Sequence, residues 1–174
     1  MTAFLEILKY TIPGLVVFAT VYYLFQQYFQ HQFRTRQLEQ RIESLKITLP
    51  LRLQAYERLM LLCDRAMLPN ALLRVQTPGM SARMLRGALL VAINQEFQHN
   101  TSQQLYVSAT LWKILKLAKS ETMQWVAQTG SETDPDADGG LLSAILLEKW
   151  EALDDQNALL KAMIAIRTEA GELF

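Results

Sequence analysis

The chain has 174 residues, 51% of them hydrophobic, and its 17 basic residues are balanced by 17 acidic ones. This length is enough for one domain with a single hydrophobic core and one further segment. The single cysteine excludes an internal disulfide. The basic residues are scattered and lack an interleaved aromatic platform, so we expect no nucleic-acid partner.

The first predicted element is an apolar helix near the start of the chain. Residues 11–25 contain no charged side chain, and the uncharged run extends over residues 10–33. A helix needs about 20 residues to cross a hydrocarbon core of about 30 Å. We therefore expect a transmembrane helix over about residues 4–26, or over about 10–29 in a second register. The alternatives are a buried core helix and a signal peptide, although bulky residues after Ala19 do not suit a cleavage site.

Basic residues near this helix predict its orientation. Four of them follow it within about 20 residues, whereas Lys9 alone precedes it. Because basic charge beside a membrane helix stays in the cytoplasm, we expect an N-terminus outside and a cytoplasmic C-terminal domain. The predicted membrane-surface basic residues are Arg34, Arg36, Arg41 and Lys46.

The sequence predicts three segments. Residues 1–33 are the transmembrane anchor with its interfacial flank, residues 34–50 a juxtamembrane helix, and residues 51–174 a cytoplasmic helical bundle. Pro50 is expected to end the juxtamembrane helix, because proline lacks the amide that a helix interior needs. Leucine and isoleucine at spacings of four, three and four residues indicate a short coiled-coil seam, which either pairs with a second copy or packs onto its own domain. The seam residues are Leu38, Ile42, Leu45 and Leu49.

Four further helices are predicted from apolar residues at helical spacing. They cover residues 51–67, 81–99, 108–128 and 141–170, with Ser81 and Ser108 as N-caps, a connector at 68–80 and a loop at 130–140. The polar residues 154–157 are a place where the last helix could be interrupted. The fold class is therefore all-α, an antiparallel bundle after the anchor. The expected core residues are Ala55, Leu59, Leu62, Cys63 and Ala66; Leu85, Ala88, Leu89, Ala92 and Ile93; Leu111, Ile114, Leu115, Ala118, Thr122 and Trp125; and Leu142, Ile145, Leu146, Trp150, Leu153, Leu160, Met163 and Ile164.

Charge is distributed unevenly along the chain. Residues 34–119 contain 13 basic and five acidic residues, a net charge of +8, whereas residues 120–174 contain three basic and 11 acidic residues, a net charge of −8. The basic half would be attracted to anionic headgroups if it lay beside a bilayer. Alternatively, the two halves neutralise each other within one bundle, and the sequence leaves both interpretations open.

Two stretches of the sequence are similar to segments of other proteins. LPLRLQAYERLMLL (residues 49–62) and EFQHNTSQQLYVS (residues 96–108) resemble an uncharacterised family of membrane-anchored bacterial proteins, found mainly in Bacteroidota. The resemblance covers most of the chain. It implies one membrane helix followed by a helical cytoplasmic domain, in a bacterial inner (plasma) membrane. The family has no assigned activity, so the resemblance assigns no site.

Two motifs have the form of metal sites but are incomplete. Glu96 and His99 form an E-x-x-H pair, yet a di-iron bundle needs two such pairs and two more glutamates, and His31 is the only other histidine. Residues 134–139 match the opening of a calcium loop, but the twelfth position is Ile145 instead of glutamate. We expect a polar helix end and a solvated acidic loop, with no metal, no cofactor and no catalytic residue.

The densest polar stretch is the predicted interaction surface. The expected function is a protein-interaction scaffold or an accessory subunit of a membrane complex, with the lipid bilayer and membrane or cytoplasmic proteins as partners. One alternative is an enzyme with an unrecognised site around Glu96 and His99. The other is a module that senses anionic lipid through basic residues 34–58. The predicted interaction surface consists of Gln95, Glu96, Gln98, His99, Asn100, Gln103, Gln104 and Tyr106.

Overall fold

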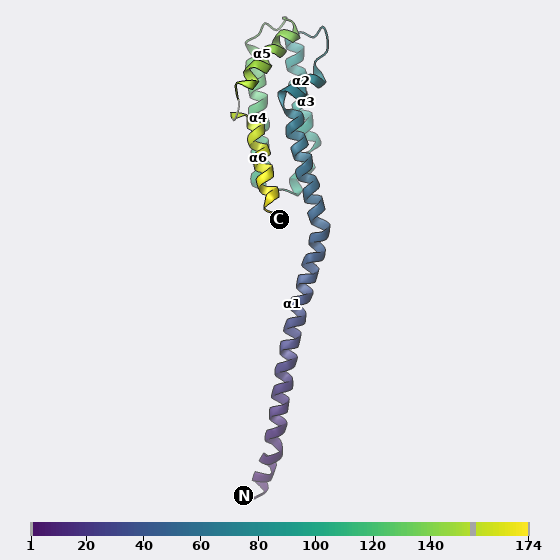
Figure 1. The fold of residues 1–174 in the computed structure, drawn as a ribbon, viewed down its shortest axis with the longest axis vertical. Coiled ribbons are helices and arrows are strands. Elements are labelled where there is room, and N and C mark those ends of the chain that lie inside the picture. Colours follow the sequence, from purple (N-terminus) through teal and green to yellow (C-terminus); the bar gives the residue numbers. More distant parts are fainter. Residues whose placement is uncertain (1, 154–155, 174) are drawn as a thin grey trace. The chain divides into compact units, whose positions relative to one another are not determined.

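The computed structural model describes residues 2–153 and 156–173, and describes the backbone alone at residues 2–13, 30–31, 33–35, 37–38 and 41. The described residues form helices and their connections, with one isolated β-bridge between Ser81 and Asp138. The predicted all-α fold is confirmed. The helices are α1 (Thr2–Ala66), α2 (Leu68–Val75), α3 (Ala82–His99), the 3-10 helix η1 (Thr101–Leu105), α4 (Ala109–Ser131), α5 (Gly139–Glu151) and α6 (Ala158–Gly171), shown in Figure 1.

The chain divides into two units, Met1–Thr48 and Leu49–Phe174, and α1 contributes to both. In the first unit, the large apolar side chains described between Leu15 and Phe29 are all exposed. Among the described residues, no helix has both the length and the apolar character needed to cross a membrane. The predicted transmembrane helix therefore has no support from the structure. The side chains of residues 4–13, which begin the expected span, lie outside those described.

Pro50 does not end a helix, so that prediction was wrong. Helix α1 continues through it to Ala66. Proline removes only its own amide donor, at a cost of about 3 kcal/mol in a helix interior. This cost is offset because apolar side chains of α1 become buried from Ala55 onward. Pro50 stands two residues after the border between the units.

The second unit has one hydrophobic core, to which each of its α-helices contributes. Helix α4 packs mainly against α6 and α3, and α3 also contacts α2 and α5. The rings of Trp125 and Trp150 meet edge to face with centroids 5.4 Å apart, joining α4 to α5. The buried stripe of α1 is the predicted one: Ala55, Leu59, Leu62, Cys63 and Ala66.

The helix starts at Ser81 and Ser108 are confirmed. The Ser81 hydroxyl accepts a hydrogen bond from the Met84 amide at 3.4 Å, and the Ser108 hydroxyl accepts one from the Leu111 amide at 3.0 Å. The connector over residues 68–80, for which the sequence predicts at most one helical turn around Ala71–Arg74, is helical over Leu68–Val75. It contains α2, which has Pro69 in its first turn, where proline is tolerated, and which buries Leu68, Ala71 and Leu72.

The predicted helix over residues 141–170 is two helices, α5 and α6. Asn157 starts α6 anew, because its side chain accepts a hydrogen bond from the Leu159 amide at 2.9 Å. This restart shifts the register of the apolar face. Leu160 and Ile164, both expected in the core, are exposed, while Leu159, Ala162 and Ile166 are buried.

The acidic loop before α5 is docked on the start of α3. The amides of Ala82 and Arg83 donate to the carbonyls of Ala137 (2.8 Å) and Pro135 (3.0 Å). A β-carbon at Gly139 would lie 2.7 Å from the Met80 carbonyl oxygen, so this approach requires glycine. The sequence predicts a solvated acidic loop. The structure differs in that the backbone of this loop is hydrogen-bonded to the start of α3.

Candidate functional site

The structure divides the predicted interaction surface into three groups. Gln95, Glu96 and His99 line a groove between α3 and the Arg65–Val75 region. Asn100 and Gln103 are buried. The remaining residues, Gln98, Gln104 and Tyr106, are exposed; Gln98 lies near the end of α3, Gln104 in η1, and Tyr106 directly after η1.

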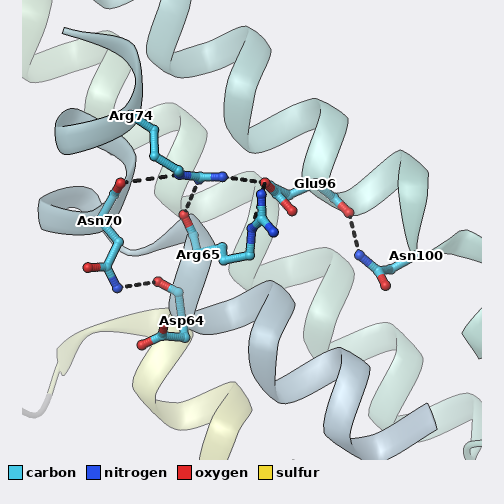
Figure 2. A network of polar contacts seen from close by, with 6 residues as sticks. All are labelled: Asp64, Arg65, Asn70, Arg74, Glu96 and Asn100. Carbon is cyan, nitrogen blue, oxygen red and sulfur yellow. Dashed lines mark hydrogen bonds and ion pairs between the residues drawn. The ribbon is translucent and has the colours of Figure 1, made fainter. Parts of the chain in front are cut away.

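The groove is built around the carboxylate of Glu96 (Figure 2). Its Oε1 accepts hydrogen bonds from Nε of Arg65 at 3.0 Å and from Nη1 of Arg74 at 2.5 Å, and Nη2 of Arg65 forms an ion pair with the same oxygen at 3.0 Å. The Glu96 side chain is only 15% exposed. We refer to this space, about 470 Å³ in volume, as the arginine groove; its lining includes Arg65, Arg74, Val75, Ala92, Gln95, Glu96 and His99.

Arg74 is held by its whole guanidinium group. Its Nε donates to the carbonyl of Asn70 at 3.2 Å, and its Nη2 donates to the carbonyl of Arg65. The Asn70 amide in turn donates to the carbonyl of Asp64 at 2.9 Å (Figure 2). The bonds to the carbonyls of Arg65 and Asp64 join α2 to the end of α1, so Arg74 stabilises the packing of these helices and also places a positive charge in the groove.

Sequence reasoning missed Arg65 and Arg74. They stand 31 and 22 residues before Glu96 in the chain. No local spacing links such distant residues, and only the return of α3 along α1 and α2 brings them together. The signal available in the sequence was a glutamate on the half-buried side of a helix, which needs a cationic partner.

The buried polar residues position the loop after α3. The Asn100 side chain donates to the carbonyl of Glu96 at 2.9 Å, and the amide of Gln103 donates to the carbonyl of Asn100 at 3.0 Å. Arg52 of α1 donates through Nε to the carbonyl of Tyr106 at 3.2 Å. Leu105 projects from this braced loop with 78% of its surface exposed. We call the exposed residues Gln104, Leu105 and Tyr106 the η1 surface.

A second polar network, also missed by sequence reasoning, joins α1, α4 and α6. The Tyr56 hydroxyl accepts from Nη2 of Arg52 at 3.0 Å and donates to Oε1 of Glu169 at 2.9 Å. Glu169 also accepts from the amide of Ser108 at 2.8 Å and from its hydroxyl. The carboxylate therefore binds the start of α4, where negative charge is favoured.

This network shifts two pKa values in opposite directions. Burial raises the pKa of the Tyr56 hydroxyl, and its hydrogen bond to Glu169 raises it further. Burial alone would also raise the pKa of Glu169, but the hydrogen bonds from Ser108 and Tyr56 and the charge of Arg52 outweigh burial, so its pKa is lowered. The network holds Glu169 as a carboxylate.

Neither metal-like motif forms a metal site in the described part of the chain. No group of three histidine, cysteine, aspartate or glutamate side chains converges there. Glu96 is neutralised by two guanidinium groups, which disfavours a cation. In the acidic loop, Asp134 accepts from the Asp136 amide and Asp138 from the Gly140 amide, while Asp136 pairs with Arg83. The side chain of His31 lies outside those described.

Cys63 is a core residue, as predicted. It is fully buried, and burial raises the pKa of its thiol to about 12. At neutral pH the thiol is therefore protonated, which makes it a poor nucleophile.

A family model described as "Family of unknown function (DUF7935)" matches residues 2–173. No curated protein and no solved structure matches the chain.

Proposed function

Since the chain belongs to DUF7935, a family of unknown function, we propose from its residues that it is a membrane-anchored helical protein that binds other proteins as a scaffold or accessory subunit. In this proposal the apolar part of α1 lies in the inner membrane of a bacterium. The N-terminus faces outward, and the second unit lies in the cytoplasm.

The observation that carries the proposal is the exposure of apolar side chains on all sides of α1. From Leu15 to Phe29 the described helix has no charged residue, and its leucine, valine, phenylalanine and tyrosine side chains are exposed. A helix that is apolar all round requires an apolar environment. The tyrosines at positions 22, 23 and 28 suit a membrane interface.

A charge placed in this segment tests the anchor. Val17→Arg should lower the fraction of the chain recovered with membranes, because arginine at the centre of a span costs about 2.5–3.5 kcal/mol for insertion. Ile47→Arg is the matched control: it is equally exposed on α1 but beyond the proposed span. Equal recovery of both variants in the membrane fraction would count against the anchor.

The η1 surface supports the role in binding proteins. Leu105 is a large apolar side chain amid polar neighbours, on a loop that the Arg52 and Asn100 hydrogen bonds fix in place. Apolar anchors surrounded by polar groups are the common form of protein interfaces. A fixed loop also loses little conformational entropy on binding.

Substitution of Leu105 tests this surface. Leu105→Ser in the full-length chain, extracted with mild detergent, should lose the proteins that co-purify with the wild type. Leu73→Ser is the matched control, because Leu73 is 85% exposed but lies on α2. Retention of every partner by Leu105→Ser, or recovery of the wild type alone as a monomer, would contradict the binding role.

A further inference from the structure

The arginine groove has one positive charge in excess. Arg65 and Arg74 contribute two positive charges, and Glu96 contributes one negative charge. All three nitrogens of Arg74 are already bonded, so this charge is presented mainly by Arg65. The Arg65 side chain is 56% exposed, and no bond from its Nη1 is found among the described residues.

Around this charge the groove offers both polar and apolar surface. Gln95 and His99 add hydrogen-bonding side chains on the α3 side, and Val75 and Ala92 provide apolar contact. The volume of about 470 Å³ lies within the range of about 300–1,000 Å³ usual for small-molecule sites. Glu96 holds both guanidinium groups in place before any ligand arrives, which reduces the entropy lost on binding.

We propose that the arginine groove binds a small aliphatic monocarboxylate, with its carboxylate on Arg65 and its aliphatic part against Val75 and Ala92. A monoanion fits because it balances the single excess charge, whereas a dianion such as phosphate would leave one uncompensated negative charge beside the Glu96 carboxylate. A planar carboxylate further matches the planar guanidinium fork. This binding depends neither on the anchor nor on the η1 surface.

Titration with 3-methylbutanoate tests the proposal. In the full-length chain in detergent, labelled with ¹⁵N at the arginine Nε, the Arg65 Nε–H signal should shift with saturation near about 1 mM, an affinity of about −4 kcal/mol. The uncharged 3-methylbutanamide and inorganic phosphate should bind at least about tenfold more weakly. An unmoved Arg65 signal, or equal binding of the amide or of phosphate, would overturn the proposal.

Calorimetric titration of two matched pairs of variants locates the site. Arg65→Gln should weaken 3-methylbutanoate binding about tenfold or more, since it removes a charge-assisted hydrogen bond; Arg58→Gln, exposed earlier on α1, should not. Gln95→Glu should have a similar effect by adding a negative charge at an exposed position, while Gln98→Glu on the same helix should not. Unchanged affinity in a folded Gln95→Glu variant would contradict the assignment even if Arg65→Gln failed to fold.

Discussion

Glu169 is the residue that connects the most distant parts of the second unit. It stands 113 residues after Tyr56 and 61 residues after Ser108, and it bonds to both. The ionised form accepts every one of these hydrogen bonds, so the carboxylate is stabilised in the folded state. The lowered pKa of Glu169 has a direct consequence for stability as a function of pH.

Glu169→Gln should destabilise the second unit by about 1.5–3 kcal/mol at pH 7, the usual loss for hydrogen bonds to a charged group. In the wild type, the contribution of Glu169 is complete above its unfolded pKa of about 4.3 and is lost as the pH falls through the lowered folded-state pKa. The variant should therefore lose less stability on acidification. Urea unfolding followed by tryptophan fluorescence measures both effects, because Trp112, Trp125 and Trp150 all lie in the second unit.

Glu172→Gln provides the comparison, since Glu172 is exposed near the end of the same helix. It should leave both the stability and its pH dependence nearly unchanged. If Glu169→Gln and Glu172→Gln gave the same acid-side curve, the network would not hold Glu169 in the way described.

At the residue scale, the sequence predicted burial well and pairing poorly. The stripe from Ala55 to Ala66 follows from helical spacing alone, and every member of it is buried. The pairs of Glu96 with Arg65 and Arg74, and of Glu169 with Ser108, depend on which helices become neighbours in space. A single sequence can indicate that Glu96 needs a cationic partner, but it does not identify which distant residue provides it.

At the scale of the helix, caps decide the register. Ser81 and Ser108 were recognisable because each stands directly before an apolar periodic run, and α3 and α4 start where expected. The sequence marks residues 154–157 as an interruption but does not identify Asn157 as the start of a helix, so the apolar face predicted beyond it has the wrong register. Pro50 shows the opposite case, in which tertiary packing outweighs a strong local preference.

The stability of two leucine-to-alanine variants tests which face of α6 is buried. Leu159→Ala should cost about 2–5 kcal/mol, because it leaves a cavity in the core, whereas Leu160→Ala should cost less than about 0.5 kcal/mol. The same tryptophan-detected unfolding measures both. A larger loss for Leu160→Ala would mean that the face predicted from the sequence is the buried one after all.

The two serine caps should contribute unequally to the stability of the second unit. Ser81→Ala removes one cap bond and should cost about 0.5–2 kcal/mol. Ser108→Ala should cost more, because the hydroxyl both caps α4 and donates to Glu169. In the Glu169→Gln background this excess should shrink, since the two substitutions then remove the same interaction. Full additivity of Ser108→Ala and Glu169→Gln would show that the serine and the glutamate act independently.

At the scale of the whole molecule, the two units differ in how far their apolar side chains are buried. The second unit buries many of its apolar side chains in one core between its own helices, whereas the large apolar side chains described between Leu15 and Phe29 of α1 are all exposed. The sequence identified the uncharged stretch because composition alone reveals it. Composition predicts that this stretch needs an apolar environment, but it does not identify what provides that environment.

The most direct test of that proposal is where the full-length chain goes when no detergent is present. After cell lysis, alkaline carbonate washing and flotation on a sucrose gradient, the account predicts that the chain rises with the membrane vesicles and that only detergent releases it. Recovery of the full-length chain in the supernatant, as a monodisperse species that needs no detergent, would contradict the central claim.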